Sequence, residues 1–160
     1  MSDVVLRPSH PFKTILVAGL LAGFLDGMDA VVYIAWMSGR SAVRVFQFIA
    51  SGALGVKSFD GGVATALLGV CFHFVIAISA AAVFYGLSLW LPTVLRRPLL
   101  WGPVYGVGVF VFMHYIVVPM SAAPKQPPLT RAALANLLFS HIFFVGIPIT
   151  WVTKRFSRLS

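Results

Sequence analysis

Four long apolar runs restrict the folds open to this chain. A helix rises about 1.5 Å per residue, so roughly twenty apolar residues cross a hydrocarbon layer about 30 Å thick. Four runs reach that length, near Thr14–Met37, Val63–Trp90, Leu99–Pro119 and Arg131–Thr153. Charged residues are 10% of the sequence, whereas they make up roughly a quarter of a soluble domain. We therefore expect an all-α membrane protein with four transmembrane helices.

The tryptophans support the same four spans, because indole rings prefer the boundary between headgroups and hydrocarbon. All four lie at the ends of the predicted spans: Trp36, Trp90, Trp101 and Trp151. The short connection LPTVLRRPLLW places the second and third spans antiparallel, and Thr130 is a predicted N-cap for the fourth. We predict that residues 1–160 form a single integral membrane domain, an antiparallel four-helix bundle.

Lysines and arginines near the span ends indicate the orientation. One side of the predicted bundle carries Arg7, Lys13, Arg96, Arg97, Lys154, Arg155 and Arg158, and the other carries Arg40, Arg44, Lys57, Lys125 and Arg131. Since basic residues favour the cytoplasmic side, we expect both termini in the cytoplasm and a first span that is retained rather than cleaved. The net charge of +8 then indicates contact with anionic lipids rather than nucleic acid.

The segment from Arg40 to Lys57 is too apolar for an ordinary loop and too short for another crossing. Polar and apolar positions alternate there at helical spacing, with Arg40, Arg44, Gln47 and Ser51 on one side and Val43, Phe46, Ala50 and Ala53 on the other. We predict a short amphipathic helix over residues 40–57, with its polar stripe toward water. It is either interfacial or part of a re-entrant hairpin.

Small residues mark where the spans touch. Membrane helices associate through close backbone approach, which glycine permits. The predicted helix-packing positions are Gly19, Gly23, Gly69, Gly102 and Gly106. In the fourth span, Pro148 is expected to bend the helix, because proline lacks an amide hydrogen.

Five ionisable residues lie inside the predicted spans, namely Asp26, Asp29, His73, His114 and His141. Counted along the helices, they fall at roughly 8 to 16 Å below the outer surface. An ionised aspartate near the centre of a span costs about 2.5 to 3.5 kcal/mol, so each must be neutral, paired or hydrated. We expect the histidines to shelter the aspartates in one polar cluster. The alternatives are aspartates that hold helices together through backbone carbonyls or that meet a partner chain.

A metal or haem site has weaker support. No two histidines share a helix at i, i+4 spacing, and only His73 and His141 match in depth. The single cysteine, Cys71, lies in the second span, and no hydrolase or phosphate-loop motif is present. We expect no metal, no cofactor and no enzymatic activity.

Five stretches of the sequence resemble a known family: LLAGFLDGMDA, RVFQFIASGALG, GGVATALLGVCFHFVIA, LLWGPVYGVGVFVFMHYIVVPMSA and SHIFFVGIPI. They are similar to small, uncharacterised bacterial inner-membrane proteins of the YagU-like group. This resemblance implies a four-helix protein of the bacterial inner membrane and carries no reaction.

Two functions are compatible with these residues. The first is a non-enzymatic accessory or scaffold subunit, which would dock helices of a larger inner-membrane complex or a second copy of the chain. The second is a proton or ion pathway that uses the Asp/His cluster as a relay.

Overall fold

The structure, a computed structural model, describes residues 6–8 and 10–159 of the chain. Within these residues four helices are long and apolar enough to cross a membrane, Pro11–Ser38, Gly62–Trp90, Pro98–Met120 and Arg131–Arg155. They confirm the predicted count of four. The largest difference in bounds is at the start of the first helix, which begins at Pro11 rather than Thr14. Four such helices are consistent with a multi-pass membrane protein.

The first two long helices, α1 (Pro11–Ser38) and α3 (Gly62–Trp90), are regular along their whole length. The third and fourth each contain a π-helical stretch. The third runs through α4 (Pro98–Phe112), η3 (Met113–Val117) and α5 (Val118–Met120), and the fourth through α6 (Arg131–Ser140), η4 (His141–Gly146) and α7 (Ile147–Arg155). Thr130 caps α6 as predicted, since its side chain accepts a hydrogen bond from the Ala133 amide at 3.1 Å.

Prolines explain the two π-helical stretches. Each stretch ends two residues before a proline, Pro119 in α5 and Pro148 in α7. A proline ring clashes with the carbonyl four residues earlier and cannot donate a hydrogen bond to it. The wider π turn moves that carbonyl and lets other amides bond across the gap.

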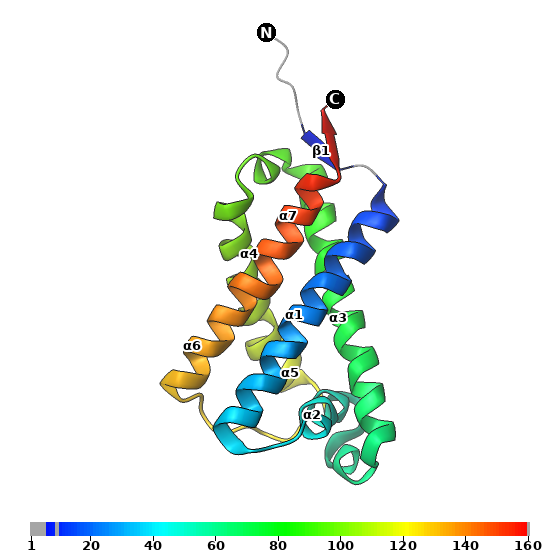
Figure 1. Ribbon diagram of the computed structural model, residues 1–160, viewed down its shortest axis with the longest axis vertical. Coiled ribbons are helices and arrows are strands. Elements are labelled where there is room, and N and C mark those ends of the chain that lie inside the picture. The colour runs from blue at the N-terminus through cyan, green and yellow to red at the C-terminus, as the bar shows by residue number, and fades with distance from the viewer. Residues whose placement is uncertain (1–5, 9, 160) are drawn as a thin grey trace.

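The chain passes back and forth between two ends of the molecule, and both described ends of the chain lie at the same one (Figure 1). There β1 (Leu6–Pro8) pairs antiparallel with β2 (Ser157–Leu159). Helix α1 packs along α3 on one side and along η4 and α7 on another, while α4 packs against η4 and α7. The fourth long helix therefore lies between α1 and α4.

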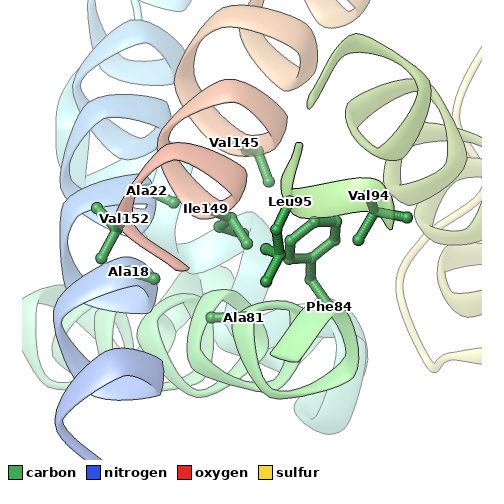
Figure 2. Close-up of a cluster of buried hydrophobic side chains, with 9 residues drawn as sticks. All are labelled: Ala18, Ala22, Ala81, Phe84, Val94, Leu95, Val145, Ile149 and Val152. Carbon is green, nitrogen blue, oxygen red and sulfur yellow. The ribbon is translucent and has the colours of Figure 1, made fainter. Parts of the chain in front are cut away.

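Helices α3 and α4 are consecutive but meet mainly through one side chain. The Tyr105 hydroxyl donates a hydrogen bond to the Ala80 carbonyl oxygen at 2.5 Å, and its ring meets the Phe84 ring edge-on at 5.0 Å between centroids. The connecting turn η2 (Pro92–Leu95) inserts Val94 and Leu95 beside Phe84 (Figure 2). All three side chains belong to the apolar core, which lies in the half of the molecule nearer the chain ends.

The predicted amphipathic segment folds as α2 (Ala42–Leu54) followed by the 3-10 helix η1 (Gly55–Asp60), at the end away from the termini (Figure 1). The prediction that its polar stripe faces water is wrong for Gln47 and Ser51, which are 2% and 0% exposed. Gln47 Nε2 donates to the Gly62 carbonyl oxygen at 3.0 Å, so the side-chain amide of Gln47 binds the first turn of α3 instead of water. Arg40 and Arg44 remain exposed.

Candidate functional site

Asp26 and Asp29 on α1 both face α6, where each accepts a hydrogen bond. Ser140 Oγ donates to Asp26 Oδ1 at 2.7 Å, and Asn136 Nδ2 donates to Asp29 Oδ2 at 3.0 Å. Both aspartates are half-buried, and Ser140 is buried. We call these four residues the Asp ladder. They form two hydrogen bonds between side chains of two long helices.

Helix geometry explains the pairing. The two aspartates are three residues apart on α1, and Asn136 and Ser140 are four residues apart on α6, so each pair lies on one face of its helix about one turn apart. The two helices run in opposite directions in Figure 1. The earlier residue on α1 therefore meets the later residue on α6. Each carboxyl group thus accepts one hydrogen bond from an uncharged donor, a hydroxyl for Asp26 and an amide for Asp29.

His73 on α3 approaches α1 one turn before the ladder. Its Nε2 lies 2.8 Å from the Gly23 carbonyl oxygen, which can only accept, so Nε2 carries the hydrogen and donates it. The ring also covers Gly27, where a Cβ atom would lie 3.1 Å from Nε2. His73 thus holds α3 against the backbone of α1.

The other two histidines of the long helices both contact Phe110. His141 Nδ1 donates to the Leu137 carbonyl oxygen of its own helix at 2.9 Å, and its ring meets Phe110 edge-on. The His114 ring stacks on Phe110 with 5.6 Å between centroids. Both rings are half-buried.

The structure therefore divides the predicted Asp/His cluster into three parts. The aspartates bind α6, His73 binds the backbone of α1, and His114 and His141 contact Phe110. Across residues 6–8 and 10–159 no hydrogen bond is found between an aspartate and a histidine, which differs from the expected shelter by imidazoles. The same residues contain no group of three or more histidine, cysteine or acidic side chains placed to hold a metal ion.

Sequence reasoning missed Asn136 and Ser140, although a signal for them was present. They are polar residues at i, i+4 spacing in the first half of a largely apolar span. Counted from the outer ends of their spans, they lie within about one helical turn of the depth of the aspartates.

The five predicted packing glycines all lie against another helix. Gly19 and Gly23 meet Ile78 and Phe74 on α3, and Gly69 meets the Phe46 carbonyl on α2. A Cβ atom at Gly102 would lie 2.9 Å from Ile147 Cα, and one at Gly106 would overlap the His141 carbonyl oxygen. Gly146 was not predicted, yet a Cβ there would overlap the Gly102 carbonyl oxygen. The backbones of α4 and η4 are in direct contact at these positions.

The predicted interfacial arginines lie at the two ends of the molecule. Arg40 and Arg44 lie near α2, where Arg44 donates to the Phe59 carbonyl oxygen at 3.3 Å and stands over the Phe59 ring. Arg96 and Arg97 lie between η2 and α4, at the end where β1 and β2 pair. All four side chains are exposed.

Comparisons with known proteins found no relative of this chain. No protein-family model matches the chain, and no curated protein or solved structure matches it either.

Proposed function

We propose that the protein is a non-enzymatic scaffold or accessory subunit of a bacterial inner membrane. Its four long helices would span the bilayer as an antiparallel bundle, with both termini in the cytoplasm and α2 near the outer face. The kinship with YagU-like proteins stays a prediction and adds no mechanism.

The observation that carries the proposal is that polar side chains inside the long helices bind neighbouring helices. The Asp ladder joins α1 to α6, and His73 joins α3 to α1. Two clefts at the ends of the molecule are lined by other residues, with no aspartate and no histidine among them. Such hydrogen bonds fix the register of helices within a membrane, where apolar surfaces have no preference for one another over lipid.

The third long helix offers a surface for a partner. Only 11% of the residues in its apolar stretch are buried, compared with 22% to 28% in the other three. Its uncovered face includes Val104, Gly108 and Val111, and a Cβ atom at Gly108 would meet nothing within 4 Å. A helix of another subunit, or of a second copy of this chain, could approach closely at Gly108.

Extraction in a gentle detergent tests this proposal. The protein should be recovered in a particle heavier than one chain with its detergent. In a Cys71→Ser background, Gly108→Cys should form a cross-linked adduct, whereas Val32→Cys on the exposed face of α1 should not. A particle with the mass of one chain, together with no adduct at position 108, would contradict the scaffold proposal.

A proton or ion pathway is the second candidate, favoured by one observation. Asp26 and Asp29 are half-buried carboxyl groups one turn apart within a membrane-length helix. Asp26→Asn keeps an oxygen that can accept the Ser140 hydrogen bond but cannot exchange a proton. This variant should abolish pH-dependent flux in proteoliposomes, while Asp60→Asn, at the exposed end of η1, should not. Equal flux through both variants would end this candidate.

A further inference from the structure

A large cleft between α4 and α7 lies at the end of the molecule where the chain ends meet. It has a volume of about 770 Å³ and is lined by Arg96, Arg97, Pro98, Leu99, Leu100, Trp151, Lys154 and Arg155. The first turn of α4 supplies one wall and the last turn of α7 supplies the other. We call this the basic cleft.

Four positive charges converge on the basic cleft, two from each wall. Arg96, Arg97 and Arg155 are exposed, and Lys154 is half-buried. The described acids lie elsewhere, because Asp26 and Asp29 bind α6 and Asp60 ends η1 at the opposite end of the molecule. None of the four cations has an acidic partner within residues 6–8 and 10–159. Their mutual repulsion would be relieved by an anion between the two walls.

The remaining walls of the cleft are apolar and uncovered. Leu99 is 71% exposed and Trp151 is 55% exposed, and Leu100 lies beside them. A tryptophan at the end of a membrane-length helix is typical of the headgroup boundary. The positive end of the α4 dipole and the negative end of the α7 dipole both lie at this cleft and offset each other, so the four basic side chains supply its charge. The site therefore joins charges suited to phosphate with surfaces suited to acyl chains.

We propose that the basic cleft binds the headgroup of an anionic phospholipid. The phosphate would lie between the Arg96–Arg97 wall and the Lys154–Arg155 wall, and the acyl chains would run along Leu99, Leu100 and Trp151. Because both walls carry two cations, a lipid with two phosphates fits the charge of the site better than a lipid with one. The inference needs only the membrane-spanning arrangement and holds whether or not the protein is a scaffold.

Lipid-dependent thermal shifts and native mass spectrometry of the detergent-purified protein test this proposal. Cardiolipin should stabilise the protein at a lower concentration than phosphatidylglycerol does, and phosphatidylcholine and inorganic phosphate should not stabilise it. The double variant Arg97→Gln/Arg155→Gln should bind cardiolipin about thirtyfold more weakly, the factor expected for two basic side chains at a membrane surface. The control Lys57→Gln/Lys125→Gln removes the same charge from exposed sites outside the cleft and should bind as the wild type does.

Three results would overturn the proposal. Phosphatidylcholine could stabilise as well as cardiolipin, the control could lose as much affinity as the cleft variant, or inorganic phosphate alone could reproduce the whole effect. The last result would assign the cleft to a free phosphate compound instead of a lipid. If the double variant does not fold, Arg97→Gln against Lys57→Gln makes the same comparison, with a loss of about fivefold expected.

Discussion

The fourth long helix is held by two neighbours in two different ways. Against α4 it uses glycine, so that the backbones at Gly102, Gly106 and Gly146 touch. Against α1 it packs apolar side chains along α7 and, at α6, adds the polar side chains of the Asp ladder. The glycine contact depends on the absence of side chains, whereas the Asp ladder depends on matching donors to acceptors.

The two kinds of contact determine different quantities. The glycine contact sets the distance between two helices, and the Asp ladder sets which residues face each other. A glycine contact holds two helices close, but any residue with a Cβ atom at the contact would disturb it. The Asp ladder tolerates a wider spacing and instead distinguishes one pairing of residues from another. In lipid, apolar helix surfaces have no preference for each other, so the hydrophobic effect that drives packing in soluble proteins is absent. Close backbone contact and hydrogen bonds between helices then decide how the helices pack.

The largest effect should follow from adding one methyl group to the glycine contact. In Gly106→Ala the new Cβ atom would overlap the His141 carbonyl oxygen, so the helices must separate. Overpacking of this kind costs about 1–3 kcal/mol. The melting temperature in detergent should fall clearly. Gly86→Ala lies inside α3 with nothing within 4 Å of the new atom, and it should melt no lower than the wild type does. An equal fall in melting temperature in both variants would contradict the claim that close backbone approach holds α4 against η4.

A smaller effect should follow from uncapping α6, which carries Asn136 and Ser140. Thr130→Ala removes the acceptor of the Ala133 amide hydrogen bond, a change that costs about 1 kcal/mol at a typical N-cap. Hydrogen exchange should rise in the first turn of α6 and stay unchanged in α7. Thr130→Ser, which keeps the hydroxyl, is the matched control. Faster exchange in α7 as well would show that the two halves of the helix are not held independently.

A still smaller effect should come from His73, whose imidazole donates a hydrogen bond to the backbone of α1. His73→Phe keeps a ring but loses the donor to the Gly23 carbonyl oxygen. Hydrogen bonds between membrane helices average about 0.6 kcal/mol, so a loss near that size is expected in thermal unfolding. His114→Phe should change less, because stacking on Phe110 is available to either ring. A larger loss in His114→Phe than in His73→Phe would contradict this assignment.

Much of the fold could be predicted because the bilayer imposes simple rules on length and polarity. Apolar length located all four long helices, and Thr130 located the start of the last. The chain could not reveal which face of α2 would be buried, since Gln47 and Ser51 have polar groups that either water or the α3 backbone can satisfy. That choice depends on tertiary contacts.

The candidate site was only partly predictable for a related reason. Charge marks Asp26 and Asp29 as costly inside a membrane, so the sequence locates them. Their partners are uncharged, and Asn136 and Ser140 carry no comparable cost that would draw attention to them. A positive charge is the stronger partner for an ionised carboxyl group, but uncharged hydroxyl and amide groups can also donate to its oxygens. The histidines instead bind carbonyl oxygens or lie against Phe110.

Double-mutant cycles test most directly the claim that the Asp ladder fixes the register of α1 against α6. The matched pairs are Asp26→Ala with Ser140→Ala and Asp29→Ala with Asn136→Ala, and the crossed pair is Asp26→Ala with Asn136→Ala. Unfolding in detergent should give coupling of about 0.6 kcal/mol, and at most about 1.7 kcal/mol, in each matched pair. The crossed pair should give almost none. Coupling in the matched pairs no larger than in the crossed pair would contradict the account.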